Sequence, residues 1–434
     1  MGKSISKYFK RSKGIICEEG IATFIRKAYI DRAFRVLKEE GILQLVRKSL
    51  PLMGFYLPKK ETLTHSKGIF STSIPSGIVP DLRPIQRDVE IAERLLRAYR
   101  LSEGDIAQRP IEYEDIWSHI KKVSQPTFFA VLKKGDPVLL ADYLCNMSRH
   151  DATHGTTQGY QEYRKIKFNP LYRHYKSFLI KDTLVSLAEA VGAIACENPE
   201  QGTWGENISL PIDELVEAIQ QMIGINIAPP TIDGGLFKII GTSTQFQERD
   251  LNAIFTAWSL SNILKESSSK AILEIGAGTG RVAYWSWHFG VQPYVIIDLP
   301  HINVIQGFYL LKALPDASIR LYGESEGKYD ITISPPHCME KLPSQQFDLV
   351  LNQDSFPEIQ IDIVRDYLIQ IKRVSRLFLS INHESRNGVG NFKQTRVLDV
   401  VTDIGGYNRL WRMPYWLRRG YVMELYEVGA VSYK

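Results

Sequence analysis

The feature that most constrains this chain is a short apolar run that ends in a glycine-rich turn, Ile272-Leu-Glu-Ile-Gly-Ala-Gly-Thr-Gly-Arg281. Buried parallel strands are short apolar runs of this kind. Gly276, Gly278 and Gly280 let the backbone adopt positive φ and approach a ligand closely. The helix that begins after the turn offers unpaired N–H groups to an anionic group. The segment therefore predicts a strand, a tight turn and a helix that together bind a small ligand.

The spacing of the glycines separates two classes of ligand. A dinucleotide fingerprint has the pattern G-x-G-x-x-G, whereas here the spacing is G-x-G-x-G and Arg281 stands at the sixth position. An acid two residues before the first glycine, Glu274, is typical of methyltransferases and can hydrogen-bond the ammonium end of the methionine moiety. The pattern therefore favours S-adenosylmethionine over a nucleotide as the cofactor.

The apolar runs of the last third of the chain predict one α/β sheet. Five short runs alternate with helical patterns, and two later runs form an antiparallel pair at the sheet edge. The five runs are 271–275, 294–297, 331–333, 347–351 and 377–381, and the pair is 408–413 with 421–428. This pattern predicts a Rossmann-like class I methyltransferase fold, with a seven-stranded sheet that ends in an antiparallel hairpin.

Two later motifs compete for the fourth strand of this sheet. Ser334-Pro-Pro-His337 resembles the motif that holds a planar nitrogen in amino-group methyltransferases, and Asn352–Glu358 resembles the corresponding segment of O-methyltransferases. We favour the second, because it gives seven strands and leaves Ser334–Cys338 as the loop after the third strand, near the adenine. Asp298 ends the second strand, where a carboxylate can accept both ribose hydroxyls. The predicted cofactor-binding residues are Glu274, Gly276, Ala277, Gly278, Gly280, Asp298, Leu299, His337 and Asn352.

Composition divides the rest of the chain. We expect a basic helical arm at 1–63, a Ser/Gly/Pro-rich linker at 64–84, a mostly helical substrate or lid domain at 85–248, and the methyltransferase domain at 249–434. Residues 1–50 hold twelve Lys/Arg and five Asp/Glu, a net charge of +7, and the whole chain carries +5, so the remainder sums to −2. A nearly neutral body argues against nucleic acid as a partner.

The arm and the cysteines suggest where the protein works. The arm fits docking on an anionic membrane or on a partner; the alternative is a solvated helical arm packed on the body. The chain has no run of about 18 uncharged apolar residues, so no membrane span is expected. The four cysteines lie far apart with no CxxC pair, which argues against a zinc site or a disulfide framework. We expect a cytoplasmic protein, peripheral at the inner face of the membrane if the arm docks there.

With these residues in view, the domain resembles the bacterial sugar O-methyltransferases of polysaccharide and antibiotic biosynthesis. The resemblance covers about residues 140–430 and is carried by these segments: Glu274–Arg281, Asp298–Pro300, Gln306–Leu310, Asn352–Glu358 and Ser380–Glu384, with Gly234–Phe237 and Arg249–Trp258 upstream. It implies a class I fold, a cytosolic location, and as acceptor a sugar hydroxyl of a glycan, a nucleotide-sugar or a glycosylated metabolite. It does not fix a catalytic residue.

A sugar hydroxyl is weakly acidic, so methyl transfer to it needs a general base or a metal. His383 follows the fifth strand and is the best candidate base, because an imidazole titrates near physiological pH. Asp354 follows the fourth strand and could orient the imidazole, and Glu384 lies next to His383. These three could also hold a divalent cation such as Mg²⁺, which we do not favour. Two alternatives stay open: an amino-group methyltransferase that uses Ser334–His337, and a catalytically inactive cofactor-binding module.

Overall fold

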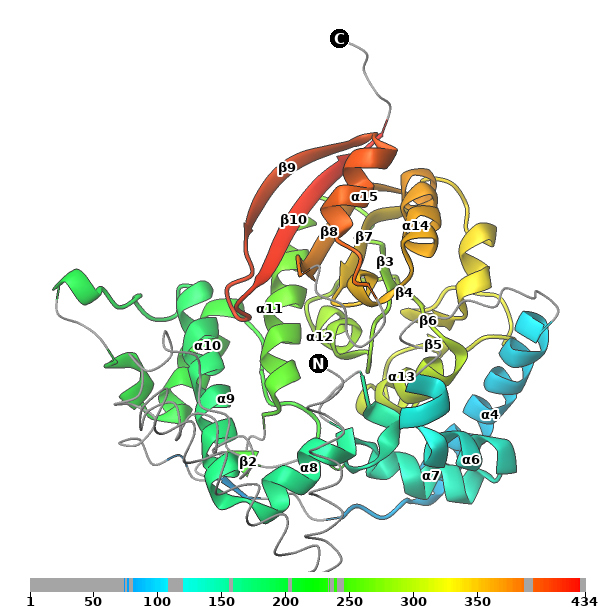
Figure 1. Ribbon diagram of the computed structural model, residues 1–434, viewed down its shortest axis with the longest axis horizontal. Helices are drawn as coiled ribbons and strands as arrows, with labels where there is room; N and C mark the ends of the chain where they lie inside the picture. Colours follow the sequence, from blue (N-terminus) through cyan, green and yellow to red (C-terminus); the bar gives the residue numbers. More distant parts are fainter. Residues whose placement is uncertain are drawn as a thin grey trace, which may run out of the picture.

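The computed structural model describes residues 74, 76–77, 81–107, 120–155, 159–201, 205–232, 234, 238–239, 246–385 and 393–429. The basic arm predicted at 1–63 lies outside the described residues, as does most of the predicted linker. In the described part of that linker, β1 (Ser76–Gly77) pairs antiparallel with β2 (Lys238–Ile239). Figure 1 shows one large sheet with helices on both of its faces, and further helices beside it.

The large sheet has the strand order β5-β6-β4-β3-β7-β8-β10-β9. The six neighbouring strands β5, β6, β4, β3, β7 and β8 run parallel, whereas β10 is antiparallel to both of its neighbours. This is the predicted Rossmann-like α/β sheet with a hairpin at its edge. The strands are β3 (Ile272–Ile275), β4 (Tyr294–Ile297), β5 (Ile319–Arg320), β6 (Ile331–Ser334), β7 (Phe347–Gln353), β8 (Ser375–His383), β9 (Tyr407–Pro414) and β10 (Tyr421–Val428).

The sheet has eight strands rather than the seven predicted. The additional strand, β5, is two residues long and pairs with β6 at the sheet edge. Two residues are too few to give the apolar run by which a buried strand is recognised. The other seven strands fall on the seven predicted runs.

The two faces of the sheet follow from the alternation of side chains along each strand. On β3, Ile272 belongs to one apolar core, whereas Leu273 and Ile275 belong to the other. The second core is closed by α14 (Ile361–Val374) and α15 (Val397–Ile404). The helices on the first face are α11 (Glu248–Ile263), α12 (Arg281–His288) and α13 (Pro300–Ala313).

The region upstream of α11 is mostly helical, as predicted, and its helices share the first core with the sheet. Arg94 of α4 pairs with Glu324 at 2.9 Å, and a Cβ added at Gly307 of α13 would lie 2.4 Å from Leu95 Cδ2. The boundary at 248/249 stays a prediction. The helices are α4 (Gln86–Ala107), α6 (Pro126–Lys134), α7 (Pro137–Cys145), α8 (Gly159–Phe168), α9 (Pro170–Ala190) and α10 (Ile212–Ile223). None of the described helices is long and apolar enough to cross a bilayer.

Candidate functional site

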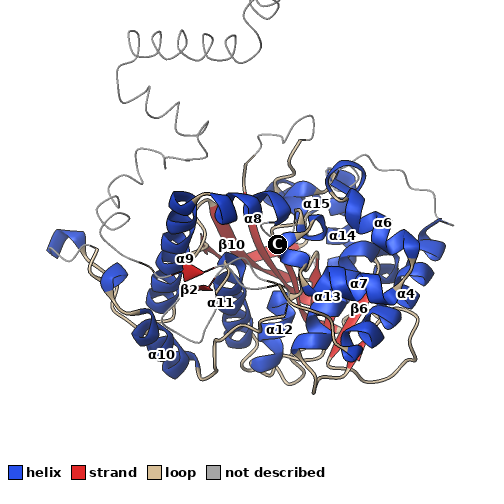
Figure 2. Ribbon diagram, turned by 90° about the horizontal axis from the view of Figure 1, so that it is seen from below, coloured by secondary structure: helices blue, strands red, loops and turns tan. Residues whose placement is uncertain are grey.

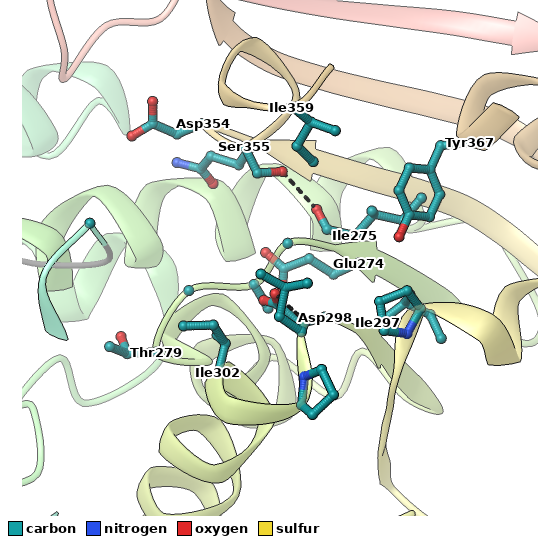
Figure 3. A pocket seen from close by; sticks show the side chains of 18 of the residues that line it. Glu274, Ile275, Thr279, Ile297, Asp298, Ile302, Asp354, Ser355, Ile359 and Tyr367 are labelled. Atoms are coloured by element: carbon teal, nitrogen blue, oxygen red, sulfur yellow. Dashed lines mark hydrogen bonds between the residues drawn. The ribbon is translucent and has the colours of Figure 1, made fainter. Parts of the chain in front are cut away.

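A cavity of about 580 Å³ opens at the carboxyl ends of β3, β4 and β7. Its walls come from the turn after β3, the ends of β4 and β7, and the helices α11, α13 and α14. In Figure 3, Asp354 and Thr279 lie at one end of the cavity, and Tyr367 and Ile297 lie at the other. Ligands of open α/β sheets bind in this kind of crevice, beyond the carboxyl ends of the strands.

The glycine turn forms the floor of the cavity. Gly276, Gly278 and Gly280 have φ angles of 77°, 58° and 82°, a region in which residues with a Cβ are strained. A Cβ at Gly276 would also lie 2.3 Å from Ser355 Oγ. Gly276 and Gly278 line the cavity, whereas Gly280 is the N-cap of α12 and faces Leu310. The turn therefore brings bare backbone against the cavity.

Glu274, the acid before the turn, is almost fully buried and lines the cavity. Its carboxylate accepts a hydrogen bond from the Tyr294 hydroxyl at 2.9 Å. Burial raises the pKa of Glu274 to about 8, and the neighbouring Asp298 adds to that rise. A cationic ligand beside Glu274 would lower this pKa, because the cation stabilises the charged form of the carboxyl group.

Asp298 follows β4 directly and lines the cavity beside the turn. It accepts hydrogen bonds from the Leu299 N–H at 2.8 Å and from Gln306 Nε2 at 2.6 Å. Burial raises the pKa of Asp298 to about 6, against the lowering effect of these donors and of the N–H groups of Ala277 and Gly278. Asp298 is therefore held in one orientation at the wall of the cavity.

The described lining of the cavity is acidic overall. It holds two guanidinium groups, those of Arg249 and Arg281, and Arg281 pairs with the buried Asp250 at 2.5 Å. The lining also holds six carboxyl groups, those of Glu103, Glu274, Asp298, Glu340, Asp354 and Asp366. Such a lining favours a ligand that carries positive charge.

The far end of the cavity is bounded by the loop after β6. Pro336 and His337 line it together with Tyr367 of α14, and His337 Nε2 lies 3.0 Å from the Tyr322 hydroxyl. The Ser334–His337 motif follows β6, which is the third of the predicted strands and pairs with β4. The fourth predicted strand is β7, which pairs with β3 and ends in Asn352 and Gln353. The favoured assignment of the two motifs is therefore the observed one.

Asp354 stands at the near end of the cavity with φ of 59°. Its carboxylate pairs with Arg249 at 3.3 Å, pairs with Arg418, and accepts a hydrogen bond from the Tyr421 hydroxyl. Burial alone would raise the pKa of Asp354, but Arg418 and Arg249 hold it below its usual range. Asp354 is therefore an ionised carboxylate that contacts Arg249, Arg418 and Tyr421 at the near end of the cavity.

His383 and Glu384 do not line the cavity. His383 is half-buried, packs edge-on against the Tyr421 ring with a centroid distance of 5.5 Å, and accepts a hydrogen bond from the Ser385 N–H. Burial lowers the pKa of His383, so the imidazole is neutral near pH 7. Glu384 pairs with Arg412 at 2.7 Å and with Arg396 at 3.0 Å. His383 therefore contacts Tyr421, which donates a hydrogen bond to Asp354. Glu384 contacts two arginines instead of these residues.

Among the described residues, no three His, Cys, Asp or Glu side chains come together at metal-binding distance. The carboxylates of Asp354 and Glu384 each contact two arginines.

Asn352, one of the predicted cofactor residues, is fully buried and does not line the cavity. Its Nδ2 donates to the Ile275 carbonyl at 2.9 Å and to Ser355 Oγ. It thereby ties the end of β7 to the end of β3. The predicted residues that do line the cavity are Glu274, Gly276, Ala277, Gly278, Asp298, Leu299, His337 and Asp354.

Several lining residues were missed from the sequence. Arg249 and Asn252 come from α11, Glu103 from α4, and Gly155 from the segment before α8. The α11 residues had a sequence signal, because α11 is one of the segments that resemble sugar O-methyltransferases. Glu103 reaches the cavity through tertiary packing and stands in no motif of its own.

No protein-family model matches the chain, and no curated protein matches it. The 1,6-didemethyltoxoflavin-N1-methyltransferase of Burkholderia thailandensis, solved with S-adenosylhomocysteine, is 13% identical over 41% of this chain and 79% of that chain, with a TM-score of 0.30. The geranyl diphosphate C-methyltransferase of Streptomyces coelicolor is 12% identical over 42% and 83%, with a TM-score of 0.30. The [4+2]-cyclase SpnF is 12% identical over 44% and 84%, with a TM-score of 0.32. The fold assignment rests on the strand order of the sheet itself.

Proposed function

We propose that this chain is an S-adenosylmethionine-dependent methyltransferase. The observation that carries the proposal is the cavity, in which a bare glycine turn stands beside two carboxyl groups, Glu274 and Asp298, whose pKa values are raised. The cofactor brings an ammonium, a sulfonium and two ribose hydroxyls. Glu274 would face the ammonium end, Asp298 would accept the ribose hydroxyls, and the adenine would lie between Tyr367 and the Pro336–His337 loop.

We further propose that the acceptor is a sugar hydroxyl. The near end of the cavity, around Asp354, is polar and is lined by Arg249 and Asn252 of α11, which suits an acceptor with several hydroxyl groups. The Ser334–His337 motif of the amino-group alternative lies at the other end, beside Tyr367. This position supports an oxygen acceptor over a planar nitrogen held by that motif.

In the proposed reaction the protein holds the acceptor oxygen in line with the methyl group, which is the main catalytic requirement of such a displacement. His383 would take the hydroxyl proton, because its imidazole is neutral and packs against Tyr421, which bonds to Asp354 at the near end of the cavity. Its Nδ1 accepts the Ser385 N–H, and it would exchange that contact for the acceptor hydroxyl. Asp354 is a poor base, since its pKa is held low. It acts as a positioning residue, which keeps Tyr421 and Arg249 in place beside the acceptor.

The test is a transfer assay on the purified full-length protein with S-adenosylmethionine and a panel of sugars, nucleotide-sugars and lipid-linked sugars. Mass spectrometry should detect an acceptor heavier by one CH₂ unit, together with S-adenosylhomocysteine. Glycans from cells with and without the protein should differ by the same unit. Methylation of an amine in the panel, with no sugar methylated, would contradict the acceptor assignment.

A further inference from the structure

The corner between α8 and α9 presents apolar side chains to solvent in a strongly basic setting. Phe168, the last residue of α8, is 71% exposed, and Leu171, in the first turn of α9, is 59% exposed. The sequence from Tyr163 to Lys176 contains five Lys/Arg and no Asp or Glu. We define this surface, Tyr163–Lys176, as the α8–α9 corner.

The local structure holds the two apolar side chains outward. Asn169 caps α9 by accepting the Tyr172 N–H at 3.1 Å, and Pro170 occupies the first position of the helix. Both features fix the backbone of the corner. Ile166 and Tyr172 are buried and anchor the corner on the body. Phe168 and Leu171 therefore form a fixed apolar tip.

Basic side chains lie near this tip. Arg164, Lys165 and Lys167 are exposed on α8, and Lys167 Nζ lies 5.6 Å from the centroid of the Phe168 ring. In Figure 1, α8 lies at the bottom of the molecule and β9 at the top, and Figure 2 shows α8 beside α9. Exposed apolar side chains next to cations are the arrangement by which interfacial helices enter the headgroup region of a bilayer.

We propose that the α8–α9 corner docks on an anionic lipid surface. Charge complementarity requires an anionic partner, which excludes the arm of this chain as the occupant, because residues 1–50 carry +7. The exposed tip requires a partner with an apolar interior directly beneath its anionic groups. A bilayer that contains anionic lipid meets both requirements.

Docking at this corner would also bring the cavity close to the membrane. Gly155 lines the cavity and stands four residues before the start of α8, whose ten residues span about 15 Å. An acceptor attached to a lipid could therefore reach the cavity from the surface. The docking itself does not depend on the proposed methyl transfer.

The experiment is co-sedimentation of the full-length protein with vesicles of phosphatidylcholine, with and without phosphatidylglycerol, over a range of salt. We expect binding only to the vesicles that contain phosphatidylglycerol, weakened by salt. The Phe168→Ser/Leu171→Ser variant should bind about tenfold less tightly or worse, because both side chains lose their burial in the bilayer. Lys165→Glu/Lys167→Glu should weaken binding similarly at low salt.

The matched control is Ile85→Ser/Met222→Ser, which removes two exposed apolar side chains elsewhere, 63% and 51% exposed. It should bind vesicles as the wild type does, and thermal melting should show all variants folded. Because the arm is unchanged in every variant, binding through the arm alone would leave them all equal. Equal binding by all variants, or no vesicle binding by the wild type, would overturn the proposal. The same variants are also tested for binding of single-stranded RNA. Corner variants that lose RNA binding but keep vesicle binding would overturn it as well.

Discussion

Glu274 is the residue whose chemistry depends most on the cofactor. Its pKa of about 8 in the free protein means that it carries a proton at pH 7. An ammonium group placed beside it would stabilise the carboxylate and lower that pKa. Binding of S-adenosylmethionine should therefore release a proton from Glu274, and affinity should rise between pH 6 and 7.5, below the pKa of an α-amino group at about 7.7–8.0.

Calorimetry in two buffers of different ionisation enthalpy measures this proton release. Glu274→Gln should remove both the release and the pH dependence, and should bind the cofactor more weakly. A wild-type titration with no proton exchange at pH 7 would show that Glu274 does not face the cationic end of the ligand.

The same pKa shift predicts how stability depends on pH in the free protein. Folding raises the pKa of Glu274 from its ordinary value of 4.5 to about 8, so the folded state binds more protons than the unfolded state between these values. Stability contributed by this group is therefore lost as pH rises, by about 1 kcal/mol per pH unit. Denaturant unfolding between pH 5 and 7.5 should show a shallower decline in Glu274→Gln than in the wild type; equal slopes would contradict the shift.

The acceptor base is tested by two substitutions. His383→Ala should lower turnover by roughly two to four orders of magnitude, the usual contribution of a general base, with cofactor affinity unchanged because His383 lies outside the cavity lining. Asp354→Asn should lower turnover without removing the pH dependence that His383 produces. Near-normal turnover of His383→Ala would exclude it as the base.

Chelation separates this mechanism from a metal-assisted one. Asp354 and Glu384 are each neutralised by two arginines, so we expect EDTA to leave turnover unchanged. Loss of activity with EDTA that Mg²⁺ restores would instead require metal ligands that differ from this set.

At the scale of elements, the contact of α4 with α13 decides whether the helical region shares one core with the large sheet. Gly307 of α13 faces Leu95 of α4, which is 1% exposed. Gly307→Val should lower the free energy of unfolding by about 1–3 kcal/mol through overpacking, and Leu95→Ala in the same chain should recover part of that loss.

Gly104 supplies the control for this substitution, because it lies in α4 with nothing within 4 Å of an added Cβ. Gly104→Val should change stability by less than about 0.5 kcal/mol. Equal effects of the two valines on denaturant unfolding would mean that α4 does not pack on α13 as described.

The strands were predictable because each is a short apolar run bounded by polar or glycine residues, and the glycine turn because its chemistry is local. The strand β5 was not predictable, because two residues are too few to show an apolar run or an alternating pattern. Asn352 was predicted at the cofactor but ties β7 to β3 instead, because its position at a strand end does not reveal which way its side chain points. Glu103 reaches the cavity from a distant part of the sequence, and no local pattern indicates that contact.

At the scale of the molecule, the helical region and the sheet build one site. The cavity draws residues from the ends of the strands, from α4 and from the segment before α8. The acidic lining of the cavity and the basic α8–α9 corner give the two surfaces opposite charge. We infer that the first suits a cationic cofactor and that the second suits an anionic membrane.

Calorimetric titration of S-adenosylmethionine tests the central claim most directly. Gly276→Ala and Gly290→Ala both place a Cβ at positive φ, 77° and 67°, but only the first meets another group, Ser355 Oγ at 2.3 Å, whereas nothing lies within 4 Å of the second. Both should be destabilised by about 1–2 kcal/mol. The account predicts one-to-one binding by the wild type and by Gly290→Ala, loss of binding by Gly276→Ala, and no binding of nicotinamide dinucleotide. Absence of binding by the wild type, or equal binding by Gly276→Ala, would contradict it.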